Sequence, residues 1–548
     1  MTPNRREAVS LLSGACIAPL MKSGAFAQAA SPSAAGMSKG PPRNPFLSAE
    51  KYAVTHFDAG QSDSFPYPVA RGTFHVDLWK QPRVRSGPIN IMTLASASPD
   101  YMWGVSSKHY TYIDVSGGGL REVTRFAALG PAGPLDPDKL DQLLKMQFTD
   151  VPQLEKALKD VWGVDDKNWA SFIAGGTYSV VDRENVLYIN SGPKGSTVYA
   201  IGLNDPKNPS AGIKVLRSID VANILKTASG ALGEGLTGLN MTYDGKLIIL
   251  GRQSVAVIDA NLTGQPHVVT FGEGEYVSNA CAVDEKGGIY VASDKIMRKV
   301  VWTGAKLSMD EADGAWAAPY DFGRQPPAVK IGIGTGSTPT LMGFGDDPDK
   351  LVVITDGADR MKLVAFWRDQ IPNGWQQQPG TQSPRIAGQI QVTCGLSPAP
   401  EFVQSEQSVV VNGYGAFVVN NMRAKGADNR LVDVIGGGPI FDPPAGCERF
   451  EWNPKTHAWR SVWTRNDVSA TSQVPTMSSA SNIVLTNGYT KQDGWVVTGM
   501  DWNTGETVHQ TIFGQDNLGN GAYALMQFLP NGDMLFNSIG GPTRVKLE

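Results

Sequence analysis

The chain has 548 residues, enough for several domains or for one large repeat architecture. Its 61 Gly and 36 Pro residues, with 41% hydrophobic residues, favour many short strands separated by turns. The formal net charge of −4 is small for this length, which argues against a surface that binds nucleic acid.

Residues 1–29 have the features of an export signal. Arg5 and Arg6 precede an apolar run, and Ala25 and Ala27 are small residues that suit cleavage by a signal peptidase. The arginine pair indicates twin-arginine export, with an ordinary secretory signal or a buried N-terminal helix as alternatives. No other stretch approaches the roughly 20 apolar residues of a membrane span. We therefore expect a periplasmic or secreted protein in which an irregular segment, residues 30–70, follows the signal.

From residue 71 to the end, predicted strands recur in groups of about four, which is the pattern of a β-propeller. The first group lies at 89–97, 101–106, 110–115 and 121–128, and the last at 522–529, 534–538 and 543–547. Because the last group has three strands, the ring needs an N-terminal strand to cover its last edge, and residues 72–79 are the predicted donor. We predict an all-β propeller of about eight four-stranded blades, with seven as the alternative.

One helical interruption is expected at about residues 135–165. Leucine and other apolar residues recur there at helical spacing on both sides of Thr149 and Asp150, which resemble a helix cap. We interpret this region as a helical hairpin inserted between blades. It either decorates the propeller or covers one face as a lid.

Three cysteines follow the signal. Cys394 and Cys447 lie in Gly- and Pro-rich surroundings, so an oxidising compartment favours a disulfide between them. Cys281 lies in an apolar strand between Ala280 and Ala282, which offer no group to activate a thiol. We interpret Cys281 as a core residue.

The stretch from Asp493 to Gly514 is the clearest copy of the repeat. Its segment MDWNTGETV, which starts at Met500, resembles the repeat of quinoprotein-like propellers, in which an Ala-x-Asp-x-x-Thr-Gly core leads to Trp. Here His509 stands in place of that Trp, and the adjacent cysteine pair of some quinoprotein dehydrogenases is missing. The resemblance implies membership of this propeller superfamily, and the cofactor stays unassigned.

A larger part of the chain, from about residue 275 to the end, is similar to a group of secreted bacterial propeller proteins. The similarity lies in residues 277–284, 334–341, 354–359 and 474–478. It supports the fold and implies no activity.

In a propeller, the position of a loop between two strands predicts the face of the ring on which the loop lies. The loops that lead into each inner strand, and those that join second to third strands, emerge on one face around a central funnel. Their cations and carboxylates would focus the electric field there, so we predict a site for a small anionic or polyhydroxylated ligand. The predicted ligand-binding residues are Glu234, Arg252, Asn279, Thr338, Asp356, Asp359, Arg360, Glu406, Lys491 and Asn520. The alternative is that they are ordinary solvated loop residues.

His109, beside Lys108 on the same face, is the predicted acid or base, and Glu275 is a further catalytic candidate. The other histidines do not recur at one blade position, so we interpret them as structural or surface residues and predict no metal site. Nucleophile-elbow, phosphate-loop and calcium-loop patterns are missing from the sequence.

Three classes of function remain open. The first is an enzyme, whether lyase, hydrolase or oxidoreductase, that uses the funnel. The second is a non-catalytic periplasmic binding or assembly propeller, and the third is a quinoprotein-like oxidoreductase. The sequence does not indicate the oligomeric state.

Overall fold

The structure is a computed structural model. It describes residues 40–87, 92–129, 133–164, 178–191, 196–222, 224–225, 236–325, 330, 332–423 and 430–547. The expected export signal and Glu234 lie outside the described residues. Residues 38–548 belong to one compact unit.

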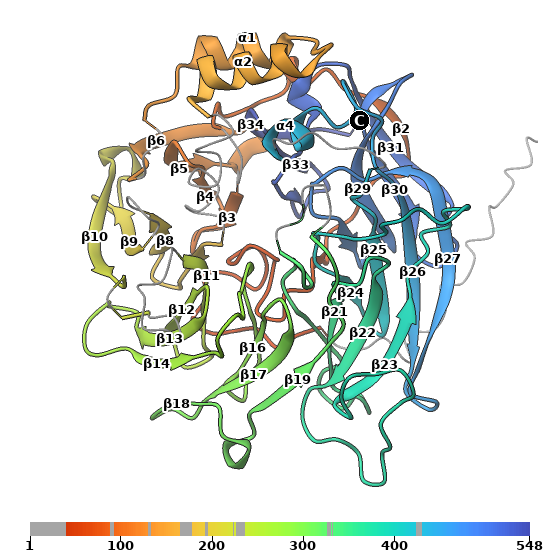
Figure 1. The fold of residues 1–548 in the computed structure, drawn as a ribbon. Coiled ribbons are helices and arrows are strands. Elements are labelled where there is room, and N and C mark those ends of the chain that lie inside the picture. The colour runs from red at the N-terminus through yellow and green to blue at the C-terminus, as the bar shows by residue number, and fades with distance from the viewer. Residues whose placement is uncertain are drawn as a thin grey trace, which may run out of the picture. The chain divides into compact units, whose positions relative to one another are not determined.

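Within the described residues, eight sheets succeed one another along the chain around a common centre (Figure 1). The first four contain β3 (Met92–Ala95), β4 (Tyr101–Val105), β5 (His109–Asp114) and β6 (Arg121–Ala127); β7 (Val180–Val181), β8 (Leu187–Ser191), β9 (Thr197–Leu203) and β10 (Ile213–Asp220); β11 (Leu236–Met241), β12 (Lys246–Gly251), β13 (Ser254–Asp259) and β14 (His267–Thr270); β15 (Ala282–Val283), β16 (Gly288–Ala292), β17 (Ile296–Trp302), β18 (Leu307–Ser308) and β19 (Trp316–Pro319).

The other four contain β20 (Thr340–Met342), β21 (Leu351–Thr355), β22 (Lys362–Trp367) and β23 (Ile386–Gln391); β24 (Val410–Asn412), β25 (Gly415–Val419), β26 (Ala445–Asn453) and β27 (Ala458–Ser469); β28 (Thr476–Ser478), β29 (Ile483–Thr490), β30 (Gly494–Asp501) and β31 (Thr507–Gly514), joined by β1 (Ser64–Phe65) and β2 (Gly72–His75); and β32 (Met526–Phe528), β33 (Met534–Ser538) and β34 (Gly541–Val545). The all-β propeller is confirmed. Seven sheets have four or more strands and one has three. The number of blades is therefore eight if the three-stranded sheet is counted as a blade and seven if it is not.

Packing between sheets explains why the middle strands are apolar on both faces. In β12, Leu247 and Ile249 pack with Val180 and Tyr188 of the preceding sheet. Ile248 and Leu250 of the same strand pack with Ile289 and its neighbours in the following sheet. Each sheet is thus buried on both sides, so its central strands are continuous apolar runs rather than alternating ones.

The hairpin of β30 and β31 has the turn that its sequence predicts. The Asp501 carboxylate accepts hydrogen bonds from the backbone N–H groups of Asn503 and Thr504, and Gly505 closes the turn with a φ of 75°. His509, which stands in the place of the repeat's Trp, is buried, and its Nδ1 lies 2.7 Å from the Ala70 carbonyl oxygen. This histidine therefore anchors the N-terminal segment.

The N-terminus closes the ring, but not through the predicted strand. β2 pairs in parallel with β31 at the outer edge of the seventh sheet. Residues 82–86 instead run antiparallel to β34 of the last sheet: Val84 N–H donates to the Pro542 carbonyl (3.0 Å), and Arg544 N–H to the Pro82 carbonyl (2.9 Å). The predicted donor at 72–79 was wrong, because those residues meet the sheet before the last.

The centre of the propeller is filled by residues 44–69, which we call the central segment (Figure 1). Its carbonyl groups accept backbone hydrogen bonds from the innermost strands of six sheets, at 2.8–3.0 Å; the donors are Ala95, Val181, Val283, Leu341, Val411 and Met477. Every residue from 52 to 65 is buried. A stretch expected to be irregular and outside the propeller is therefore its core.

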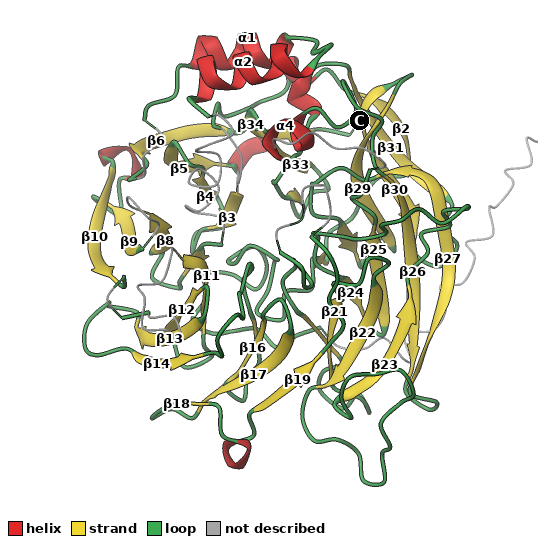
Figure 2. Ribbon diagram, viewed as in Figure 1, coloured by secondary structure: helices red, strands yellow, loops and turns green. Residues whose placement is uncertain are grey.

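The predicted helical hairpin is present as α1 (Pro137–Lys145) and α2 (Val151–Trp162), drawn in red in Figure 2. Asp150 is the N-cap of α2, and its carboxylate accepts from Gln153 N–H at 2.9 Å. The other helices within the described residues are α4 (Arg430–Ile435) and the short η1 (Leu78–Lys80), η2 (Ser116–Gly118), η3 (Pro209–Ala211), η4 (Glu311–Asp313) and η5 (Asn517–Gly519). Among these described helices, none has the length and apolar character that a bilayer crossing requires.

Cys281, Cys394 and Cys447 are free and buried. The expected bond between Cys394 and Cys447 is therefore not observed. Cys447 lies within β26 and Cys394 in an apolar cluster, rather than in exposed loops. The interpretation of Cys281 as a core residue agrees with its place in the cluster between the third and fourth sheets.

Candidate functional site

The central segment has an unusual backbone. Tyr52, Phe57, Gln61 and Asp63 have φ values of 69°, 74°, 60° and 53°, a region that non-glycine residues seldom adopt. Such conformations cost free energy and concentrate at functional sites, where packing holds them. Here the packing includes Phe65, which stacks on Phe528 with ring centroids 5.2 Å apart.

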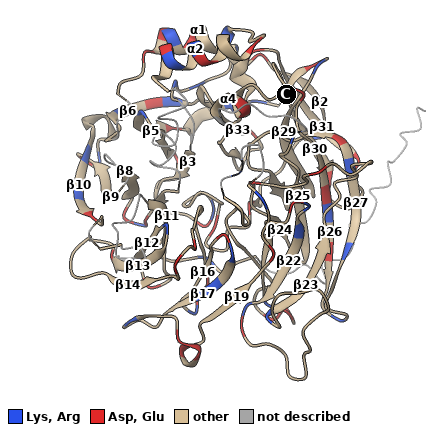
Figure 3. Cartoon of the chain, viewed as in Figure 1, with Lys and Arg blue, Asp and Glu red and all other residues tan. Residues whose placement is uncertain are grey.

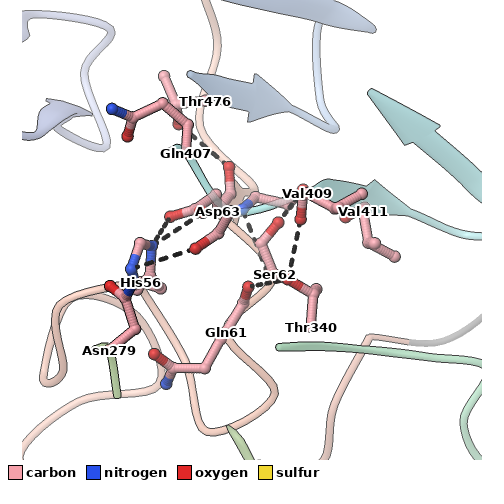
Figure 4. A network of polar contacts seen from close by, with 12 residues as sticks. His56, Gln61, Ser62, Asp63, Asn279, Thr340, Gln407, Val409, Val411 and Thr476 are labelled. Atoms are coloured by element: carbon pink, nitrogen blue, oxygen red, sulfur yellow. Dashed lines mark hydrogen bonds and ion pairs between the residues drawn. The ribbon is translucent and has the colours of Figure 1, made fainter. Parts of the chain in front are cut away.

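His56 and Asp63 form a buried pair in this strained loop (Figure 4). The imidazole Nδ1 lies 3.0 Å from both carboxylate oxygens of Asp63. Burial raises the pKa of Asp63, and the adjacent imidazole opposes that shift. In the tautomer whose Nδ1–H donates to this carboxylate, Nε2 is the acceptor. Nε2 lies 3.4 Å from the hydroxyl oxygen of Ser408.

Two further groups of contacts hold the pair in place. The Asp63 carbonyl accepts from Met477 N–H at 2.9 Å and from the Thr476 hydroxyl at 3.2 Å (Figure 4). Asp58 carries an ion pair to Lys51 (2.6 Å) and a hydrogen bond from the Ser62 hydroxyl. The pair is therefore tied to the seventh sheet and to the rest of the loop.

Loops that lead into inner strands bring polar groups to the histidine. The Tyr178 ring lies 5.8 Å from the His56 ring, and its hydroxyl donates to the side-chain oxygen of Asn279. Burial raises the pKa of Tyr178, Thr338 lowers it, and Glu406 raises it further. The Thr338 hydroxyl thus lies close to the phenol, although no hydrogen bond of standard geometry links them. We call this set the central cluster; its members are His56, Asp63, Tyr178, Asn279, Thr338, Glu406 and Ser408.

A buried cation lies beside this cluster. Lys330 is fully buried, and its ammonium donates to the side-chain oxygen of Gln404 at 3.0 Å. Burial lowers the pKa of Lys330 to about 8, against the opposing effects of Asp356 and Glu406. In the described part of the chain, no carboxylate lies within ion-pair distance of this ammonium. An anionic group of a ligand would complete its surroundings.

Three of the predicted ligand-binding residues, Asn279, Thr338 and Glu406, lie in the central cluster. Asp356 is fully buried, and its carboxylate lies 3.0 Å from the Lys362 ammonium. Its charge acts to raise the pKa of Lys330. Asn279, Thr338 and Glu406 were identified by their position before inner strands, and Asp356 by its position between the second and third strands of its sheet.

The other predicted residues lie elsewhere. Asp359 pairs with Arg324, Arg360 donates to the Pro400 carbonyl, and Lys491 forms an exposed ion pair with Asp442. Asn520 is buried and binds backbone groups of Ala522 and Ile435. Arg252 accepts Val277 N–H through its backbone carbonyl. Figure 3 shows both signs of charge interspersed around the ring rather than one ring of cations.

The three predicted catalytic residues contact groups outside the central cluster. Lys108 is buried, and its ammonium donates to the Trp162 carbonyl at the end of α2 (3.3 Å). Burial, with Arg125 and Lys108, lowers the pKa of His109 to about 4. Glu275 pairs with Arg298 (2.8 Å to Nη2) and accepts from Ser293 (2.9 Å).

His56, Asp63, Tyr178, Lys330 and Ser408 were not among the predicted site residues. A signal existed for His56 and Asp63. The available signal was local composition: the run THFDAGQSDS, residues 55–64, concentrates His, Asp, Gln and Ser without a strand pattern. Across the described residues, no three His, Cys, Asp or Glu side chains are arranged to bind a metal ion.

These observations define a β-propeller whose centre is occupied by its own N-terminal segment, with a polar cluster around a buried His–Asp pair. The chain belongs to the same family as an uncharacterized protein of Archaeoglobus fulgidus, to which it is 32% identical over 389 residues, 68% of this chain and 70% of that protein. No protein-family model matches the chain.

Several solved structures are similar in outline. A europium-containing methanol dehydrogenase has a TM-score of 0.46 at 9% identity, over 88% of each chain. The dihydro-heme d1 dehydrogenase NirN has a TM-score of 0.38 at 11% identity, over 91% of this chain and 76% of that one. BamB from Moraxella catarrhalis has a TM-score of 0.32 at 11% identity, over 66% of this chain and 90% of that one. At these values none of the three assigns a function to this chain.

Proposed function

We propose that this protein is an exported enzyme that acts on a small anionic or polyhydroxylated substrate in the central cluster, with His56 as general base. The observation that carries the proposal is the buried contact of His56 Nδ1 with Asp63. A carboxylate on Nδ1 fixes the tautomer and orientation of the ring and stabilises the imidazolium that forms when Nε2 takes a proton. The strained backbone of Asp63 supports a functional role for the pair.

The preference for an anionic substrate rests on Lys330. A buried ammonium with a lowered pKa and an amide as its hydrogen-bond partner is poorly compensated, so a carboxylate or phosphate of a ligand would bind there favourably. Hydroxyl groups of the same ligand would find amide and hydroxyl partners in Asn279 and Thr338.

Two alternatives remain from the sequence. A non-catalytic binding propeller is favoured by the burial of residues 52–65, which fill the channel. A quinone-dependent oxidoreductase rests on the repeat at β30 and β31, and the absorbance spectrum of the purified protein tests it. Export rests on Arg5 and Arg6, and replacing both with Lys should keep the protein in the cytoplasm if the twin-arginine route is used.

A thermal-shift screen with small carboxylates, phosphate esters and polyols tests the proposed enzyme. A ligand present at 100 times its Kd should stabilise the wild type by about 2.7 kcal/mol. Conversion of that ligand should fall about 10²- to 10⁴-fold in His56→Gln, since general base catalysis contributes that much. His267→Gln is the matched control, because His267 is exposed on β14.

Conversion at the wild-type rate by His56→Gln would contradict the proposed role of His56. Binding without any conversion by the wild type would favour the binding propeller instead.

A further inference from the structure

We propose that Ser408 is a nucleophile and that Ser408, His56 and Asp63 form a triad that cleaves esters of small anionic acids through an acyl-enzyme. The proposal rests on the site of the proposed function and deepens it by naming the reacting group and the substrate class. A Ser–His–Asp triad is recognised by geometry rather than by the order of its residues in the chain.

The contacts of His56 have the required directions. Asp63 binds Nδ1 at 3.0 Å, and the Ser408 hydroxyl lies on the opposite nitrogen at 3.4 Å. That second distance is slightly longer than the 2.6–3.2 Å of a working nucleophile–base pair, as is common before substrate binds. Among the described residues, His56 is the hydrogen-bond partner of the Ser408 hydroxyl.

The backbone fixes the serine relative to the histidine. Ser408 lies two residues before β24. In that strand, both the backbone N–H and the carbonyl of Val411 form hydrogen bonds with the central segment. Its N–H donates to the Ser62 carbonyl (3.0 Å), and its carbonyl accepts from the Ser64 hydroxyl (2.6 Å). The nucleophile and the base therefore sit on two segments joined by hydrogen bonds within a few residues of the reacting atoms, as a preorganised site requires.

Neighbouring loops supply groups for the acyl oxygen and for the anionic part of the substrate. The Thr340 hydroxyl donates to the Val409 carbonyl at 2.9 Å, which places the loops before β20 and β24 side by side. Thr338, on the first of these loops, has a buried hydroxyl with no hydrogen-bond partner of standard geometry, and we assign it as donor to the acyl oxygen. The Lys330 ammonium donates to Gln404, four residues before Ser408, and its side chain packs against Gly336, whose carbonyl accepts from Asn279 of the cluster. This buried cation suits an anionic substituent of the substrate.

The reaction balances with water as the co-reactant. The Ser408 oxygen attacks the ester carbonyl carbon while its proton moves to His56 Nε2, and the imidazolium then gives that proton to the departing alcohol. Water attacks the acyl-serine and loses its proton to Nε2, which returns it to the Ser408 oxygen as the acid leaves. One ester and one water yield one alcohol and one carboxylic acid.

A fluorophosphonate probe tests the nucleophile without knowledge of the natural substrate. Intact-mass and peptide analysis of the full-length protein should show one phosphonyl adduct, located on Ser408. Ser408→Ala should give no adduct, and His56→Gln should lower the labelling rate at least 100-fold. Ser405→Ala is the matched control, because Ser405 is a buried serine on the same loop that binds Gln407 and Asn421 instead of a histidine. It should label at the wild-type rate.

Labelling of Ser408 at equal rates in the wild type and His56→Gln, or no labelling of Ser408 in the wild type, would overturn the triad. If Ser408→Ala does not fold, Ser408→Cys replaces it, and its alkylation by iodoacetamide should slow at least 10-fold when His56 is also changed to Gln. A Ser408→Ala protein that still converts a ligand from the screen would refute the triad but leave His56 as base. Full conversion by His56→Gln would instead refute the proposed function.

Discussion

The packing of the central segment leads to a quantitative prediction for Phe57→Ala. Phe57 is 1% exposed, and its ring lies 4.7 Å from the Tyr52 ring, edge to face, and 6.3 Å from the Phe65 ring. Removing a buried phenyl group costs about 3–5 kcal/mol because the cavity collapses only in part. With an unfolding entropy of about 2.1 cal/mol/K per residue over roughly 500 residues, this free energy lowers Tm by about 3–5 °C.

Differential scanning calorimetry of the wild type and Phe57→Ala measures this shift. Phe322→Ala is the control, because Phe322 is 49% exposed and its loss should lower Tm by less than about 1 °C. If Phe57→Ala also lowers Tm by less than about 1 °C, the central segment is not packed inside the ring in solution, and the site built on it fails with it.

Three further predictions concern residues that the sequence placed in the site or in a disulfide. Glu275→Gln should lower the free energy of unfolding by about 1–3 kcal/mol, because it leaves the largely covered Arg298 without its counter-charge, yet ligand conversion should persist in the folded enzyme. His109 has its pKa lowered to about 4 from an ordinary value of 6.5, chiefly by burial, so between these values the unfolded chain binds a proton that the folded chain does not. The free energy of unfolding should therefore fall as pH decreases from 6.5 to 4, and chemical denaturation of His109→Gln should show a flatter profile. In guanidinium without reductant, Cys394 and Cys447 should both react with iodoacetamide; a mass 2 Da lower with no alkylation would show that they are bonded.

The sheets could be predicted from sequence because their signals are local. The turn from Asp501 to Gly505 and the apolar runs such as Leu247 to Leu250 carry their structure in a few adjacent residues. Propeller topology then predicts that Asn279, Thr338 and Glu406 lie near the centre, because the loops that lead into the inner strands of a propeller meet there.

The central segment could not be predicted in the same way. Its backbone partners lie in six sheets, so its hydrogen bonds impose no period on its own sequence, and the sequence predicts only an irregular segment. His56 and Asp63 lack a nearby strand or helix pattern, and Ser408 is 352 residues away from the histidine that it approaches. Only the folded ring brings these groups together. The disulfide expectation failed for a related reason, since Gly- and Pro-rich flanks did not reveal that both thiols are buried, Cys447 in β26 and Cys394 in an apolar cluster.

The central segment also fixes the positions of the sheets relative to one another, because one short stretch of chain forms hydrogen bonds with many of them. Tyr52 is bonded to Phe528, 476 residues along the chain, and Val69 to Ser481, 412 residues along. Inserting or deleting one residue between Tyr52 and Asp63 would shift the register of several sheets at once, whereas the same change in an outer turn would disturb one. Such long-range pairing also slows folding, because the first part of the chain to be made finds its last partners only when synthesis is nearly complete.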